Sequence, residues 1–176
     1  GTLISMSEQV LESSARPDAQ RAMRLASYAS VTVAFILIVA KTSAWLATDS
    51  IAVLSSLIDS FLDALASIVT LIAIRHSLQP ADREHRFGHG KVEALAALAQ
   101  SAFIVGSAVL LLFEAGARSL DPQEITRGNV AIYVMLFSIA LTFMLVLIQR
   151  WAIRKSGSVA ISADSLHYTG DLLMNA

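Results

Sequence analysis

Two pairs of ionisable residues have the chemical types and the spacing of metal ligands. Asp59 and Asp63 lie four residues apart in the stretch LIDSFLDALAS, and His167 and Asp171 repeat this spacing near the end of the sequence. Residues four apart on an α-helix lie on one face, so both members of a pair would project in the same direction. The pairs offer three carboxylates and one imidazole, which are common ligands of a four-coordinate zinc-like ion. They therefore predict one metal site, formed by Asp59, Asp63, His167 and Asp171.

The segments that carry these pairs have the composition of membrane-spanning helices. Hydrophobic residues make up 55% of the 176 residues and charged residues only 15%, whereas soluble domains average about 25% charged residues. Residues 130–148 contain no charge, and a helix of this length crosses about 30 Å of hydrocarbon. We predict an all-α integral membrane protein, a bundle of transmembrane helices. The predicted spans are residues 25–47, 51–74, 92–117, 129–150 and 158–176. Residues 1–21 are predicted to be a tag remnant followed by a flexible cytoplasmic N-terminus.

The predicted depths of the two pairs allow them to meet. At about 1.5 Å per residue, Asp59 and Asp63 lie roughly 12 and 18 Å from the outer end of their span. His167 and Asp171 lie roughly 15 and 21 Å from the inner end of theirs, so both pairs fall near the middle of the membrane. Ionisable groups are costly there and usually face a partner or a transport path. The other interpretation pairs each acid with a lysine or a backbone group, but the long side chain of Lys41 is expected to snorkel to the outer interface.

Two further groups of residues leave alternatives open. Asp164 fits either a role at the inner mouth of the predicted site or a simple cap or interface role. In the loop ADREHRFGHGK, His85 and His89 are four residues apart and Asp82 precedes the first histidine by three. One helical turn would bring these three together as an open metal site. An ordinary solvated loop accounts for them equally well.

The distribution of charge predicts the orientation in the membrane. Lys and Arg accumulate on the cytoplasmic side of membrane proteins. One side of this chain has Arg16, Arg21, Arg24, Arg75, Arg83, Arg86, Lys91, Arg150, Arg154 and Lys155, and the other has Arg118 and Arg127. We therefore predict a cytoplasmic N-terminus. The formal net charge of −1 argues against a nucleic-acid partner, because such a partner requires a basic face.

Three motifs together resemble one protein family. The stretches LIDSFLDALAS, PADREHRFGHGKVEALAALAQS and ADSLHYTGD occur in the order and spacing found in the transmembrane part of cation diffusion facilitators. The resemblance covers Leu25 to the last residue and is strongest to the bacterial zinc and ferrous-iron efflux antiporters. The family has six transmembrane helices and a C-terminal cytoplasmic domain. The resemblance implies that five helices are present here with the fifth truncated, and that the sixth helix and the cytoplasmic domain are absent.

The resemblance also implies roles for particular residues. The tetrahedral transport site would consist of Asp59, Asp63, His167 and Asp171, and a second site at the cytoplasmic boundary would consist of Asp82, His85 and His89. Lys91 occupies the position where relatives form a charge interlock that helps hold a homodimer together. In the family, one histidine with three aspartates goes with zinc, cadmium or ferrous iron, and four carboxylates go with manganese.

These observations lead to an expected function. A buried site of three carboxylates and an imidazole should take up protons when empty, and a divalent ion expels them because its ligands must be deprotonated. We expect an exporter of Zn²⁺, with Fe²⁺, Cd²⁺ and Mn²⁺ as alternatives, that exchanges metal for H⁺ in the bacterial inner membrane. The alternatives are a membrane metalloenzyme and a metal-sensing membrane module. We do not expect an enzyme, because catalytic zinc sites keep an open position and no HExxH motif is present.

Overall fold

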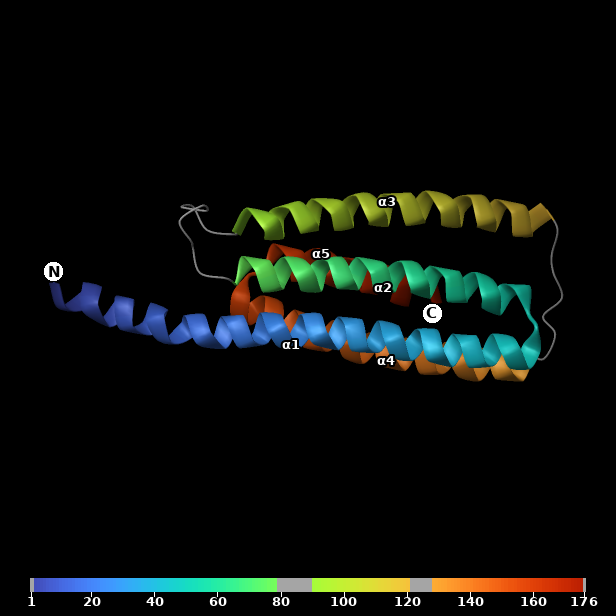
Figure 1. Ribbon diagram of the computed structural model, residues 1–176, viewed down its shortest axis with the longest axis horizontal. Helices are drawn as coiled ribbons and strands as arrows, with labels where there is room; N and C mark the ends of the chain where they lie inside the picture. The colour runs from blue at the N-terminus through green and yellow to red at the C-terminus, as the bar shows by residue number, and fades with distance from the viewer. Residues whose placement is uncertain (1, 79–89, 121–127, 176) are drawn as a thin grey trace.

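Five α-helices make up the described part of the chain. A computed structural model describes residues 2–78, 90–120 and 128–175, and the side chains of residues 17–78, 94–117, 119–120 and 128–173. The helices are α1 (Thr2–Thr48), α2 (Ile51–Ser77), α3 (Gly90–Leu120), α4 (Gly128–Ser156) and α5 (Val159–Asn175). They lie roughly alongside one another as a bundle (Figure 1). Each of the first four predicted spans falls wholly within one of these helices.

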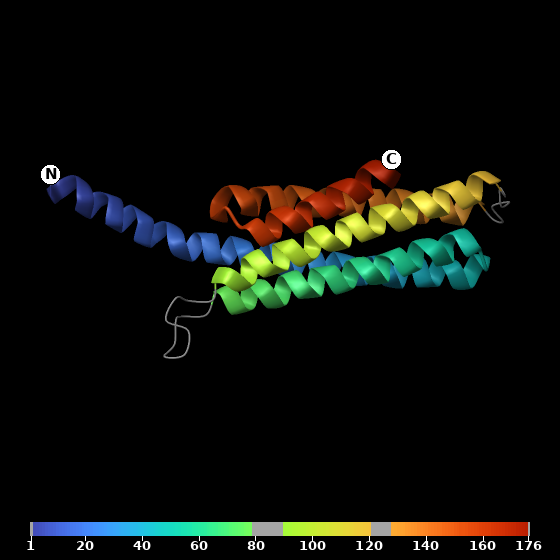
Figure 2. The ribbon, with the colours of Figure 1, turned by 90° about the horizontal axis from the view of Figure 1, so that it is seen from above.

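The N-terminal part of the chain is helical and belongs to α1. Helix α1 begins at Thr2, and the prediction that residues 1–21 are a tag remnant followed by a flexible cytoplasmic N-terminus stays a prediction. The segment from Met6 to Met23 contains many good helix formers, and a helix that is nucleated in a packed bundle extends at little further cost. This part of α1 projects beyond the ends of the other helices (Figure 2).

The helices pack as a closed ring. Helix α1 packs against α2 and α4, α5 packs against α3 and α4, and α2 packs against α3. The ring therefore runs α1–α2–α3–α5–α4 and returns to α1. Helix α2 also contacts α5 across the ring, and the two run antiparallel (Figure 1). This arrangement brings the two ligand-bearing helices of the sequence prediction together.

The surface and the interior have the polarity expected in a lipid bilayer. Large apolar side chains point outward, and Leu112, Phe113 and Tyr133 are 74%, 75% and 73% exposed. The interior, in contrast, contains many serine, threonine and glutamine side chains. Apolar surface of this extent is uncommon in soluble monomers. Among the described residues, four helices are long and apolar enough to cross a membrane: Pro17–Thr48, Ile51–Ser77, Ala94–Ala117 and Gly128–Ser156. The chain is an integral membrane protein.

One end of the bundle is closed by small and apolar side chains. Ala22 and Ala26 of α1 pack with Ile74 of α2, Ala152 of α4 and Ile161 of α5. All five side chains are no more than 1% exposed. Small residues allow helices to approach closely without a hydrophobic driving force. The helices are therefore tightly packed at the end where α5 begins.

A short turn with a left-handed glycine connects α4 to α5. Gly157 has a φ of +64°, and its N–H donates to the carbonyl of Ile153 at 2.7 Å. The Ser158 hydroxyl accepts the N–H of Ile161 at 3.3 Å and caps the first turn of α5. Glycine at the C-terminal end of a helix adopts this conformation without the steric cost of a Cβ atom. The turn sets the direction in which α5 returns along the bundle.

Replacing Gly157 by alanine should lower the free energy of unfolding by about 1–2 kcal/mol, because an L-residue is strained at positive φ. A Cβ atom at Gly157 would meet nothing within 4 Å, so the backbone conformation is the source of the cost. Gly106→Ala is the matched control, since Gly106 also has open space but lies inside α3, where alanine favours the helix. Thermal unfolding in detergent measures both. Equal shifts for the two variants would contradict this account.

Candidate metal centre

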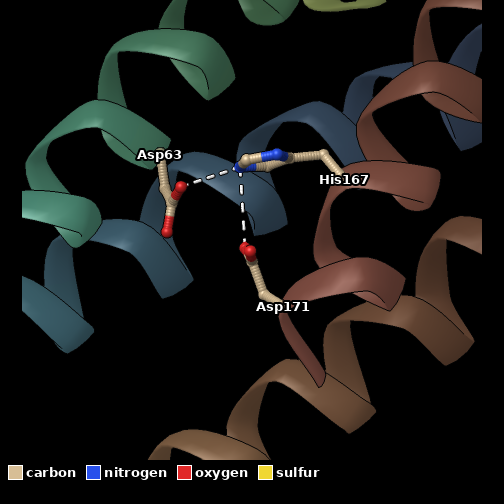
Figure 3. A group of neighbouring side chains, drawn as sticks. All are labelled: Asp63, His167 and Asp171. Atoms are coloured by element: carbon tan, nitrogen blue, oxygen red, sulfur yellow. Dashed lines mark hydrogen bonds and ion pairs between the residues drawn. The ribbon is translucent and has the colours of Figure 1, made fainter. Parts of the chain in front are cut away.

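Three of the four predicted ligands converge between α2 and α5. The Nε2 atom of His167 lies 2.7 Å from Asp63 Oδ1 and 3.6 Å from Asp171 Oδ2. One ligand atom from each of the three residues lies within 4.8 Å of the other two. Figure 3 shows Asp63 pointing from α2 toward the imidazole, and Asp171 approaching the same nitrogen from one turn further along α5. Among the described residues, this is the group of acidic and histidine side chains close enough together to hold a metal ion.

Aromatic neighbours hold the imidazole in place. The ring of Phe103 on α3 meets the ring of His167 edge-on with centroids 6.2 Å apart, and Tyr168 does so at 5.4 Å. The His167 side chain is only 4% exposed, whereas those of Asp63 and Asp171 are 19% and 31% exposed. The histidine therefore lies at the most buried part of the site, and the two carboxylates are the more accessible ligands.

A cavity leads from this group to the end of the bundle at the α1–α2 turn. Its volume is about 450 Å³, and it is lined by residues of all five helices. The walls run from Asp63 and His167 to Ala52 at the start of α2, Ala115 near the end of α3 and Ala131 at the start of α4. The site thus communicates with this end, while the opposite end is packed.

Asp59, the fourth predicted ligand, lies in the same cavity but outside the three-residue group. It lines the cavity one turn from Asp63 on α2, and its carboxylate is not among the clustered ligand atoms. The i, i+4 spacing places both aspartates on the same face, so Asp59 stands toward the open end. Its role as a ligand stays a prediction.

Asp164 is the centre of a buried hydrogen-bond network on the closed side of the site. It is 1% exposed, and its carboxylate accepts bonds from Ser30 at 2.7 Å, Gln149 at 2.7 Å and Gln100 at 3.4 Å. Ser67 extends the network, because its hydroxyl lies 2.9 Å from that of Ser30 and 2.6 Å from that of Tyr168. All five helices contribute. A simple cap or interface role, one of the two alternatives left open for Asp164, does not describe this environment. The other alternative, a role at the inner mouth of the site, stays a prediction.

The network was not predicted as a unit from the sequence. Gln100 and Gln149 are long polar side chains within the predicted spans, and buried polar groups need partners. This was the available signal. It could not indicate that both amides reach one carboxylate on α5.

Lys41 does not follow the snorkelling prediction. Its ammonium group donates to Ser60 Oγ at 2.7 Å and to the carbonyl of Ser56 at 3.3 Å, and the residue lines the cavity. The carboxylates that line the same cavity attract the ammonium group inward, and this attraction opposes the gain in hydration at the interface. The prediction was therefore wrong about where the charge lies.

The predicted cytoplasmic site lies outside the described residues. Asp82, His85 and His89 all belong to the undescribed stretch between α2 and α3. Lys91 lies in the first turn of α3, but its side chain is not described. The second metal site and the dimer interlock stay predictions.

Comparison with known proteins identifies the family. The model of the cation efflux transmembrane domain matches residues 27–176. The chain belongs to the cation efflux family. This confirms the resemblance to cation diffusion facilitators, which rested on three motifs.

Several curated relatives in the cation efflux family are similar over most of the chain. A protein named cation-efflux pump FieF from Shewanella oneidensis is 52% identical over 154 residues, which is 88% of this chain and 52% of the relative. FieF of Pectobacterium carotovorum is 47% identical over 159 residues, covering 90% of this chain and 53% of the relative. FieF of Yersinia pestis is 48% identical over 160 residues with the same coverage. The chain spans about half the length of the curated relatives it matches.

Proposed function

We propose that this protein exports a divalent metal cation from the cytoplasm in exchange for protons, with Zn²⁺ as the first candidate and Fe²⁺, Cd²⁺ and Mn²⁺ as alternatives. The observation that carries the proposal is the approach of Asp63, His167 and Asp171 from two antiparallel helices at the buried end of a cavity. Imidazole and carboxylate are ordinary ligands of these ions. The relatives named as cation-efflux pumps support the same direction of transport.

The contact between His167 and Asp63 supports the proton-exchange part of the proposal. The Nε2 atom of His167 and the Oδ1 atom of Asp63 lie 2.7 Å apart. At this distance a proton lies between them, because an unprotonated nitrogen and a carboxylate oxygen would repel each other. A tetrahedral zinc ion bound to both at about 2.0 Å would hold the two atoms about 3.3 Å apart. The ion must therefore displace the shared proton and separate the two ligands. Metal and proton compete for the same pair of atoms.

Zn²⁺ binding should weaken as the pH falls, by about tenfold per pH unit for each proton displaced. The reason is that the ligands bind metal only in their deprotonated forms. Titration of the purified protein with Zn²⁺ at a series of pH values measures this slope. An affinity that does not change between pH 6 and pH 8 would contradict proton competition.

The proposed orientation places the N-terminus in the cytoplasm. The excess of Lys and Arg on that side supports it. The cavity then opens toward the outside, and the packed end with the Asp164 network faces the cytoplasm. This arrangement corresponds to a transporter that has opened to release its ion, which is one of the two states that alternating access requires.

Flux into proteoliposomes tests the transport proposal. Zn²⁺ uptake is measured with a fluorescent indicator inside the vesicles, with and without an imposed pH gradient. We expect uptake that follows the gradient and is lost in Asp63→Ala. Flux that ignores the gradient would argue against exchange, and equal flux in the variant would place the path elsewhere.

A membrane metalloenzyme is the second candidate, because three ligands beside an open cavity also match catalytic zinc sites. The flux experiment distinguishes the two, since an enzyme would bind Zn²⁺ without carrying it across the bilayer. A metal-sensing module would likewise bind without flux.

Three further features belong to the transport proposal. They are a homodimer, a tetrahedral site that includes Asp59, and a location in a bacterial inner membrane.

A further inference from the structure

Lys41 brings a positive charge into the cavity that holds the candidate metal ligands. It comes from α1 and reaches α2, where its Nζ atom donates to Ser60 Oγ at 2.7 Å and to the Ser56 carbonyl at 3.3 Å. Ser60 directly follows Asp59 in the sequence and is 1% exposed. The two bonds hold the ammonium group against the part of α2 that carries both aspartates.

The surroundings of this ammonium group are acidic. Among the described residues that line the cavity, Lys41 is the one lysine or arginine, and the acids are Asp59, Asp63, Asp171 and Glu114. Because Lys41 shares this cavity with Asp59, Asp63 and Asp171, its positive charge is attracted to their carboxylates. In a protein interior such attractions are far stronger than in water. The ammonium group therefore offsets part of the negative charge of the site when no metal is bound.

The same charge must repel an arriving metal ion. A divalent cation between Asp63, His167 and Asp171 would share the cavity with the Lys41 ammonium group. In the empty site, the ammonium group is attracted to the ionised carboxylates. Once a metal ion neutralises these carboxylates, the repulsion between the ammonium group and the metal ion dominates. Lys41 thus makes the empty site more stable and the filled site less stable. Both effects lower the affinity for the ion.

We propose that Lys41 is an affinity-setting residue of the transport site, a tethered cation that weakens the hold of the site on its divalent ion and so speeds release into the cavity. The inference rests on the proposed transport function. A pump gains from this arrangement, because three or four ionised ligands in a buried site would otherwise release a divalent ion slowly. Lys41 is not itself a ligand, since an ammonium group has no lone pair.

The dissociation constant of Zn²⁺ for the whole chain in detergent tests this inference. We expect K41Q to bind Zn²⁺ at least tenfold more tightly than the parent and to release it correspondingly more slowly to an excess of chelator. The direction of the change in affinity is informative, because structural damage at a binding site would weaken Zn²⁺ binding and not strengthen it. K41R keeps the positive charge and should stay closer to the parent than K41Q. If K41Q does not fold, K41M removes the same charge and keeps an apolar stem of similar length.

Two controls separate the possible failures. K155Q removes the same charge from an exposed position in the last turn of α4, and its dissociation constant should match that of the parent. D63A tests the site itself. If D63A binds Zn²⁺ like the parent, the proposed function fails. If D63A loses binding while K41Q binds no more tightly than the parent, the proposed site stands and the role of Lys41 is overturned.

Discussion

Replacing His167 by alanine should abolish Zn²⁺ binding at micromolar concentrations. The imidazole Nε2 is the atom on which the other two ligands converge, at 2.7 Å from Asp63 and 3.6 Å from Asp171. Loss of residues that merely support a ligand costs 10–100-fold in metal affinity, so we expect the loss of this ligand to cost about a hundredfold or more. Isothermal titration calorimetry of the purified protein measures the effect.

His76→Ala is the matched control for this prediction. His76 lies exposed in the last turn of α2, away from the cavity-lining residues. The same chemical change there should leave the dissociation constant as in the parent. A loss of binding in both variants, or in neither, would show that the convergence on His167 does not hold the ion.

Replacing Asp164 by alanine should lower the free energy of unfolding by about 3 kcal/mol or more. The carboxylate accepts hydrogen bonds from Ser30 of α1, Gln100 of α3 and Gln149 of α4. Alanine would leave these buried donors without their acceptor, and each unsatisfied buried group costs about 1–3 kcal/mol. Asp164→Asn keeps the shape but presents an amide to three donors, so it should fall between the parent and Asp164→Ala. Unfolding by a denaturing detergent or by heat measures the differences.

Asp18→Ala provides the comparison for Asp164. Asp18 is exposed on α1, and substitutions at such positions usually change stability by less than about 0.5 kcal/mol. If Asp164→Ala unfolds within about 1 kcal/mol of the parent, the network does not hold the five helices together. If it is strongly destabilised while Asp18→Ala is not, the network is a principal contact of the closed end of the bundle.

The binding prediction for His167 and the stability prediction for Asp164 concern neighbouring parts of the structure. His167 and Asp164 lie one turn apart on the same face of α5. His167 belongs to the group of candidate ligands, and Asp164 belongs to the hydrogen-bond network. Tyr168 connects them, since its ring meets that of His167 and its hydroxyl bonds Ser67. In the proposed orientation, opening the site to the cytoplasm would require a rearrangement of the packing around Asp164. The candidate metal site and the closed end of the bundle are therefore in direct contact through Tyr168.

The sequence by itself determined the membrane-spanning helices and the spacing of the candidate ligands on them. Helix length, apolar composition and the i, i+4 spacing are local properties, so the spans and the pairs Asp59–Asp63 and His167–Asp171 could be predicted directly. The high cost of ionisable groups in a membrane identified the acids as unusual. The three motifs indicated the family, which the comparisons confirmed.

The tertiary structure alone decided which side chains meet. The contact of His167 with Asp63 joins residues 104 positions apart, and it depends on how α2 and α5 are rotated and packed. The same holds for Lys41, which turns toward α2, and for Asp164, which gathers donors from three other helices. Periodicity defines the face of each helix on which a residue lies, but not the neighbour that this face contacts. Contacts between helices depend on the packing of the whole bundle, and for this reason the local sequence could not predict them.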